Sequence, residues 1–75
     1  MGQLDGFAPR EVRRVLERRG WTHIRTTGSH QIDEHPDSPD LVSLPNHDPV
    51  RTGLLRGIIR KMWLSVNAFL EVARK

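Results

Sequence analysis

Four histidines are the strongest chemical signal in this chain, because three of them fall on one predicted hairpin. His23, His30 and His35 lie on or beside two strand-like segments, and His47 closes the strand-like segment that follows. Imidazole titrates near neutral pH and can act as a general base or a general acid. His30 is the main candidate, because it follows a Gly28-Ser29 turn whose backbone can approach a ligand closely. A small basic domain that displays imidazoles on a sheet indicates a nucleic-acid partner, and cleavage is one use of those imidazoles.

RNA suits such a site because its 2′-hydroxyl is a built-in nucleophile. Cleavage then needs a base for the hydroxyl proton, an acid for the leaving 5′ oxygen, and cations for the phosphate. His30 fits either proton-transfer role, and His47 is the first candidate for the second one, with a water or leaving-group proton source as the fallback. Backbone and cationic groups that suit phosphates complete the prediction. The predicted RNA-binding residues are Arg25, Gly28, Ser29, His47, Arg51, Arg56, Arg60 and Lys61.

Other interpretations of the histidines stay open. Strict alternation along a strand places His30 on the same face as Ile32. If Ile32 belongs to the core, His30 is a packed strand residue, unless it begins the strand at the edge of the core or a bulge redirects it. His47 is equally a loop histidine that bonds its local backbone. His23 and His35 are interpreted as ordinary surface residues.

No metal or cofactor is predicted. His30 with Asp33 or Glu34, and His47 with Asp48, are acceptable ligands by type. No spacing here repeats a known metal motif, however, and nucleophilic-serine and glycine-rich phosphate-loop motifs are also absent from the sequence.

Composition limits the class of protein. The chain has 75 residues, which is enough for one domain, and it has no cysteine for disulfides or thiolate metal sites. The net charge is +3, and ten of the twelve cationic side chains are arginines, whose planar fork matches phosphate oxygens. An arginine bias also occurs in proteins from GC-rich genomes that never touch RNA. Apolar runs are too short to span a membrane, and a cytoplasmic protein is expected.

Periodicity predicts the secondary structure. Residues 1–6 are expected to be a loose terminus, followed by a helix over 9–19 that ends at Gly20 and carries Arg10, Arg13 and Arg14 on a solvated face. Strands are predicted over 22–26, 29–34 and 41–44. Thr52 is a plausible N-cap for a helix with an apolar stripe from Leu54 to Met62, and a last short helix covers 66–73.

The predicted fold is α+β, with the order α-β-β-β-α and a short extra C-terminal helix. An antiparallel three-stranded sheet, covered on one face by helices, is the simplest arrangement of these elements. Its inner face is expected to consist of Ile24, Ile32, Val42 and Leu44, with His23 and Arg25 pointing outward. This is the order of double-stranded-RNA-binding domains, although a fold alone does not give a function.

Four separated signatures now resemble one family. They are the helix end at Gly20-Trp21, the Gly28-Ser29-His30 turn, the strand end Val42-Ser43-Leu44-Pro45-Asn46-His47, and the helix around Gly53-Leu54-Leu55-Arg56-Gly57-Ile58-Ile59 with Leu64-Ser65 and Phe69 after it. Together, over about Arg10 to Leu70, they resemble the HicA toxins. Met62-Trp63 departs from the family pattern, which has a small residue and glycine before Leu-Ser; a buried Trp63 would change the packing of the last two helices.

The resemblance implies the toxin of a bacterial type II toxin–antitoxin pair, with a double-stranded-RNA-binding-like fold. It implies a metal-independent endoribonuclease that cleaves mRNA and is silenced by a HicB-type antitoxin. It also implies that His30, the histidine of the Gly-Ser-His motif, is the catalytic residue. Two alternatives remain: a non-catalytic RNA-binding module of the same fold, and a protein that serves only as an interaction partner.

Overall fold

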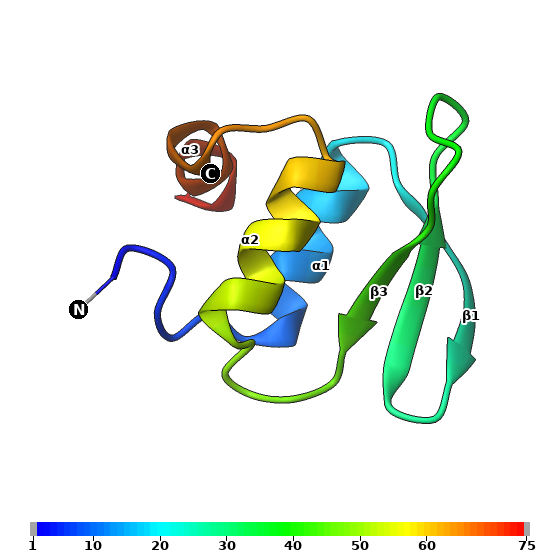
Figure 1. Ribbon diagram of the computed structural model, residues 1–75, viewed down its shortest axis with the longest axis horizontal. Helices are drawn as coiled ribbons and strands as arrows, with labels where there is room; N and C mark the ends of the chain where they lie inside the picture. The colour runs from blue at the N-terminus through cyan, green and yellow to red at the C-terminus, as the bar shows by residue number, and fades with distance from the viewer. Residues whose placement is uncertain (1, 75) are drawn as a thin grey trace.

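The structure is a computed structural model that describes residues 2–74. Its elements follow the order α1, β1, β2, β3, α2, α3 (Figure 1). Their bounds are α1 Pro9–Arg18, β1 Thr22–Thr27, β2 His30–Glu34, β3 Val42–Pro45, α2 Thr52–Lys61 and α3 Val66–Arg74. The three strands form one antiparallel sheet in the order β1-β2-β3. The predicted α+β fold, including the extra C-terminal helix, is confirmed.

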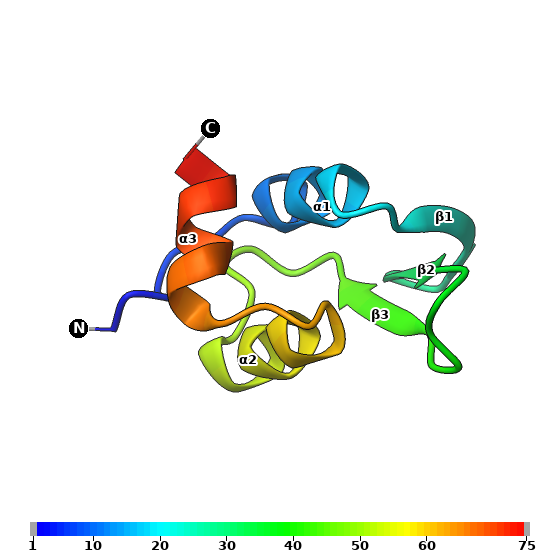
Figure 2. The same cartoon turned by 90° about the horizontal axis from the view of Figure 1, so that it is seen from above.

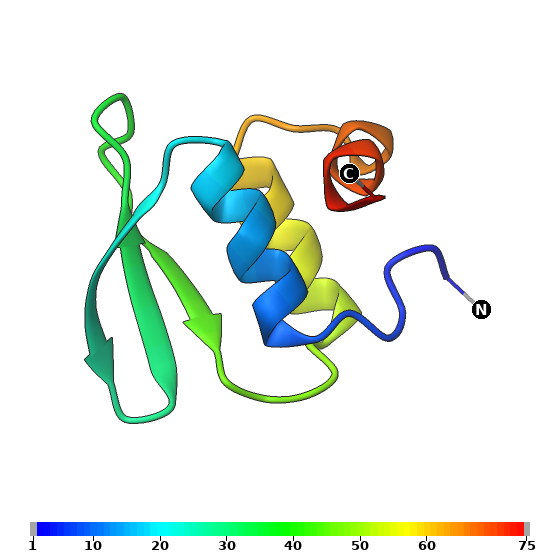
Figure 3. The same cartoon turned by 180° about the vertical axis from the view of Figure 1, so that it is seen from behind.

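The elements are arranged in layers. Helices α1 and α2 both contact β3 and cover one face of the sheet, and α3 packs on α1 and α2 (Figures 1 and 2). Seen from behind, α1 lies in front of α2, with the sheet on one side of the two helices and α3 on the other (Figure 3). Within residues 2–74, no helix covers the second face of the sheet. This outer face is therefore open.

One cluster of buried side chains joins the helices to β3. Helix α1 contributes Val12, Val15 and Leu16, as its helical spacing predicts. The other buried members are Leu4, Trp21, Val42, Leu44, Val50, Leu55, Ile58, Ile59, Met62, Phe69 and Leu70. Leu4 shows that the N-terminal segment packs on the core, which its sequence pattern does not indicate. Leu54 was predicted to belong to the apolar stripe of α2, but it is exposed because it lies on the side of the helix away from the core.

Helix α1 ends in the predicted way. Gly20 has a φ of +88°, and the backbone N–H of Trp21 donates to the carbonyl of Leu16 at 2.9 Å. The N–H of Gly20 donates to the carbonyl of Glu17 at 3.1 Å. These two bonds are those of a Schellman stop, which satisfies carbonyls that the helix itself cannot.

Helix α2 ends in the same motif, but without a glycine. Trp63 has a φ of +59°, and the N–H of Leu64 donates to the carbonyl of Ile59 at 3.3 Å. A side chain in this left-handed region costs about 1–2 kcal/mol, which is why glycine is the usual residue there. The Trp63 side chain is 58% exposed, so it does not lie between the last two helices. Met62, which precedes it, is buried. The N-cap of α2 is Arg51, one residue before the predicted Thr52.

Strand β2 turns an unexpected pair of residues toward the helices. Asp33 pairs with Val42, and Gln31 pairs with Leu44, so both polar side chains share the inner face with the core residues of β3. Arg13 of α1 reaches them: its Nη2 forms a salt bridge with Asp33, and its Nε donates to Gln31 Oε1 at 2.6 Å. The prediction that Arg13 lies on a solvated helix face was therefore wrong. Helical spacing alone cannot predict this contact, because the carboxylate of Asp33 comes from a strand that is distant in sequence.

The same register moves two predicted core residues out of the core. Ile32 pairs with Ser43 on the outer face, because it alternates with Gln31 and Asp33. Ile24 lies where the β1–β2 register shifts between His23 and Arg25, and it is exposed. A bulge residue has no partner opposite it and breaks the alternation on which the prediction relied. Only Val42 and Leu44 of the predicted inner face are buried.

Asp33 depends on Arg13 for its stability in the interior. Its side chain is 0% exposed and that of Arg13 is 17% exposed. Within residues 2–74, Asp33 Oδ2 has no hydrogen-bond partner. Removing one member of a buried ion pair leaves an uncompensated charge and typically costs about 3–5 kcal/mol. A domain of this size has a total stability of only about 4–11 kcal/mol, so this one pair decides a large share of it.

We therefore expect Arg13→Met to destabilise the fold by about 3 kcal/mol, because the Asp33 charge then stays buried without a partner. The double variant Arg13→Met/Asp33→Leu should recover much of this loss, since neither charge remains. Urea unfolding measures both, and Glu34→Ala, one residue along β2 and exposed, is the matched control. Equal effects of Arg13→Met and Glu34→Ala would contradict the role given to the pair.

A second prediction compares two glycines. Gly20→Ala should cost about 1–2 kcal/mol, because φ is +88° and the added Cβ would lie 3.1 Å from His35 Nε2. Gly57→Ala lies inside α2 with open space around it and should stabilise by up to about 1 kcal/mol. Thermal unfolding of the two variants gives the comparison. A Gly20→Ala variant as stable as the parent protein would rule out the strained helix stop.

Candidate functional site

His30 stands at the start of β2, directly after a two-residue turn. It pairs with Thr27 on β1 and with Pro45 on β3. Gly28 and Ser29 form the loop, one residue later than the predicted Thr27-Gly28 turn, and Gly28 has a φ of +58°. Positive φ at the first of two loop residues is the type II′ pattern, for which glycine is preferred. The turn therefore places His30 at the first position of β2.

The outer face of the sheet carries His30. Residues paired across strands share a face, so His30 lies with Thr27 and Ile32, while Gln31 and Asp33 point to the helices. His30 and Ile32 share a face, as strand alternation predicts. Ile32 is not a core residue, however, so His30 is exposed and not packed. A two-residue turn at Gly28-Ser29 would have predicted from the sequence that Thr27 is the cross-strand neighbour of His30.

Arg25 lies on the same outer face, and the bulge places it there. The register passes from His23 opposite Asp33 to Arg25 opposite Ile32, with Ile24 as the extra residue. Because one residue is inserted, Arg25 changes face relative to His23. Arg25 is thus diagonal to His30, at a Cβ separation of roughly 7–8 Å that a long side chain can bridge. The side chains of His23 and Arg25 are both exposed, but the prediction that both point outward was wrong for His23, because His23 pairs with Asp33 and so lies on the inner face.

The end of β3 is tied to the turn before His30. The backbone N–H of Asn46 donates to the carbonyl of Ser29 at 2.6 Å, beyond the last ladder pair of His30 with Pro45. Ser29-His30 and Asn46-His47 are consequently held at one end of the sheet. The sequence predicted both segments as functional, and the structure brings them together.

Hydrogen bonding separates the four imidazoles. His23 Nε2 lies 3.0 Å from Thr26 Oγ1, and His35 Nδ1 accepts from the Asp37 N–H at 3.0 Å. His47 Nδ1 donates to the Pro49 carbonyl at 3.1 Å. For His30, residues 2–74 supply no such bond. Among the four imidazoles, the ring of His30 is the one without a hydrogen bond to the described part of the chain.

The bond made by His47 sets its tautomer. A carbonyl can only accept, so His47 Nδ1 must carry the proton in this contact. In the neutral ring Nε2 is then an unprotonated acceptor. His47 bonds its local backbone, as one interpretation of the sequence held, and still keeps a nitrogen available for proton transfer.

The remaining predicted cations are not gathered around His30. Arg51 is the N-cap of α2, and Lys61 Nζ donates to the carbonyl of Leu41 at 3.0 Å. Arg56 and Arg60 line a cavity between α2 and the start of α3, and none of the residues that line it belongs to the sheet. The predicted RNA-binding residues therefore fall into two separate groups.

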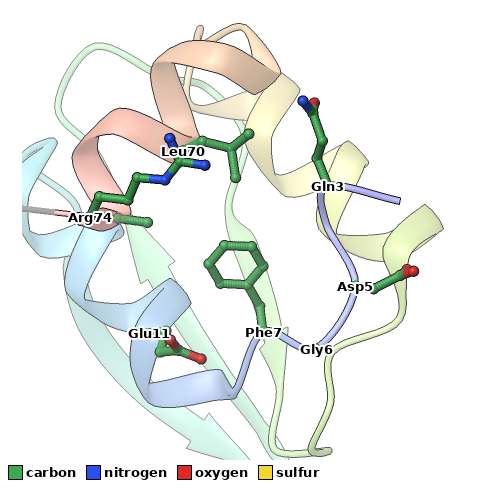
Figure 4. Close-up of a pocket in the computed structure, with 8 residues that line it drawn as sticks. Gln3, Asp5, Gly6, Phe7, Glu11, Leu70 and Arg74 are labelled. Carbon is green, nitrogen blue, oxygen red and sulfur yellow. The ribbon is translucent and has the colours of Figure 1, made fainter. Parts of the chain in front are cut away.

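Another cavity, of about 330 Å³, lies between the N-terminal segment, α1 and α3 (Figure 4). Phe7 forms its wall and meets Phe69 edge-on at 5.2 Å. Its carboxylates already serve backbone amides: Asp5 Oδ2 accepts from Gly2 at 2.8 Å, and Glu11 Oε1 accepts from Ala8 at 2.8 Å. These side chains hold the N-terminal segment and the first turn of α1, so this cavity offers no free acid–base pair.

The structure leaves little support for the metal ligands considered from the sequence. Asp33 faces the helices and pairs with Arg13, on the opposite face of β2 from His30. Over residues 2–74, no group of three or more His, Cys, Asp or Glu side chains is placed to hold a metal ion. In the same range, none of the helices is long and apolar enough to cross a bilayer.

One of two comparisons with known proteins gave a match. A search of curated proteins gave no match. The family model described as the HicA toxin of bacterial toxin–antitoxin systems matches residues 9–63, which is well over half of the 75-residue chain. The match runs from the start of α1 through the His30 turn to the end of α2. This chain belongs to the HicA toxin family.

Proposed function

We propose that this toxin is an endoribonuclease that cleaves mRNA, with His30 as its general acid or base. One observation carries the proposal: His30 is exposed on the open sheet face, and the described chain gives its ring no hydrogen bond, while the other three imidazoles are engaged locally. Proton transfer to a substrate requires a ring nitrogen that is free to meet it, and no hydrogen bond within the described chain occupies either nitrogen of His30. RNA, as a long chain, suits an open face better than an enclosed cavity.

In the proposed reaction the 2′-hydroxyl of RNA attacks the adjacent phosphorus. A base takes the hydroxyl proton, an acid protonates the leaving 5′ oxygen, and the products are a 2′,3′-cyclic phosphate and a free 5′-hydroxyl. His30 performs one proton transfer. His47 is the candidate for the other, through its unprotonated Nε2, because the bond from Asn46 to Ser29 holds the end of β3 beside the turn that precedes His30.

Charge stabilisation is assigned to the residues around the turn. Arg25 lies diagonally across from His30 and can pair with a non-bridging phosphate oxygen. The Gly28-Ser29 backbone lets the phosphate approach closely, because no side chain occupies Gly28 and the space around it is open. No step in this scheme requires a metal ion or cofactor.

His30→Ala should abolish cleavage, with a fall in rate of about 100-fold or more, the usual contribution of a positioned acid or base. Induced expression should arrest growth for the parent protein and not for the variant, with total RNA on a gel as the direct readout. His23→Ala is the matched control, because His23 is also an exposed histidine of the hairpin. Cleavage should persist in EDTA.

The alternative function has a distinct outcome in the same experiment. A non-catalytic RNA-binding module would bind RNA without cutting it in the parent protein and in His30→Ala alike. Equal toxicity of both proteins would likewise show that His30 is not the catalytic residue.

We further propose that the antitoxin partner implied by the family is of the HicB type and covers the open sheet face. Masking one exposed catalytic surface is the simplest inhibition, and a cationic face attracts an acidic partner. Arg25→Glu should then weaken the complex about tenfold or more, measured by calorimetry. Arg74→Glu, which makes the same charge change on α3, should have little effect. A complex in which His30 remains open to solvent would contradict this arrangement.

A further inference from the structure

Three residues at the C-terminal part of α2 and just beyond it are not used by the proposed cleavage site. Arg56 and Arg60 lie four residues apart on one side of α2, and Trp63 follows directly after the helix ends. Together they line a cavity of about 430 Å³, whose other lining residues include Ser65 and Val66 at the start of α3. Its lining contains no carboxylate. Among residues 2–74, neither guanidinium forms an ion pair.

Trp63 is held in place although it is mostly exposed. The His35 ring meets its indole edge-on, with centroids 5.0 Å apart and an interplanar angle of 83°. The buried Trp21 lies 6.1 Å away. His35 is itself fixed by its bond from the Asp37 N–H. A large ring is thus oriented on the surface, at a backbone position with positive φ where glycine would avoid the strain.

The α2–α3 groove, defined here by Arg56, Arg60, Trp63, Ser65 and Val66, combines two features that suit one kind of ligand. An oriented indole presents a flat apolar surface on which any unpaired nucleobase can stack. Two unpaired guanidiniums beside it match the oxygens of a phosphate. The cavity volume also lies within the usual range for sites that hold a small organic group, about 300–1,000 Å³. A base next to a phosphate is the repeating unit of single-stranded nucleic acid.

We propose that the α2–α3 groove binds one unpaired nucleotide of RNA, with its base on Trp63 and its phosphate between Arg56 and Arg60. This inference rests on RNA as the substrate class in the proposed function, but not on the chemistry of His30. The groove adds affinity for single strands and carries out no reaction.

The groove is separate from the cleavage site. Trp63 contacts His35 just beyond the end of β2, whereas His30 begins that strand. The two histidines are five positions apart along extended chain, a span of about 16 Å. In Figure 1 the β1–β2 turn lies at the bottom of the view and the C-terminal end of α2 near the top. An RNA strand that binds at both places must therefore extend over several nucleotides. It must also be single-stranded at Trp63, because the bases of a duplex are paired and cannot stack on the indole.

Binding is best tested in the full chain carrying His30→Ala, so that RNA stays intact. Anisotropy of a short fluorescein-labelled single-stranded RNA should show affinity reduced about tenfold or more by Trp63→Gly, the loss expected for one stacked base. Trp63→Phe should retain most of the affinity, because it keeps an aromatic face. Glycine suits the positive φ, and circular dichroism checks that both variants fold.

A charge-matched pair of variants tests the phosphate contact. Arg56→Gln/Arg60→Gln should weaken binding clearly more than Arg10→Gln/Arg14→Gln, since the second pair has the same spacing on α1 and is also exposed. The same oligonucleotide annealed to its complement should show no dependence on Trp63. Such a result would establish recognition of an unpaired base and not of backbone charge alone.

Three results would overturn the inference. Trp63→Gly could bind single-stranded RNA as tightly as the parent, the two arginine pairs could lose affinity equally, or Trp63→Gly could weaken only the antitoxin complex, which would make the groove a protein-docking site. Failure of the proposed function is a different result: the protein with His30 intact would cut no RNA while Trp63-dependent binding persisted.

Discussion

The buried ion pair between Arg13 and Asp33 determines how the sheet meets the helices. A carboxylate without solvent needs its cation, so β2 can pack on α1 only with Asp33 facing inward. Alternation then turns His30 and Ile32 outward along the whole strand. A shift of one residue would bury an imidazole and an isoleucine, and would leave Arg13 without its partner. The exposure of the candidate catalytic residue thus depends on a contact on the opposite face of its own strand.

Local backbone features then refine the outer face. The Gly28-Ser29 turn starts β2 at His30, and the bulge at Ile24 moves Arg25 onto the same face. A bond from Asn46 to Ser29 draws the end of β3 to the turn. Each feature is short in sequence, but together they place a proton-transfer group, a cation and open backbone at one corner of the sheet. Such a corner suits a phosphodiester of an extended chain.

The two ends of the molecule have different chemistry. The turn end carries exposed imidazole and guanidinium groups, whereas the other end carries two tryptophans around His35. Trp63 occupies a backbone position with positive φ, where glycine is the favoured residue. The helix stop is still intact, because the hydrogen bonds of the motif come from the main chain. The fold therefore accepts a tryptophan at this position and gains an exposed aromatic surface, which we propose to bind a nucleobase separately from the chemistry of His30.

The sequence by itself determined the element order, the stop of α1 at Gly20, the buried residues of α1 and β3, and the candidate His30. These follow from local rules: helical spacing, glycine at positive φ, and a histidine after a turn. Only the tertiary structure decided which face of β2 meets the helices, with Arg13 pairing with Asp33. It also decided the bulge at Ile24 and the positions of Arg56 and Arg60. Each depends on which groups meet across distant elements, because a charge such as Asp33 is acceptable inside only where another element supplies Arg13. Periodicity assigns a strand two faces, and the packing partner decides which one is buried.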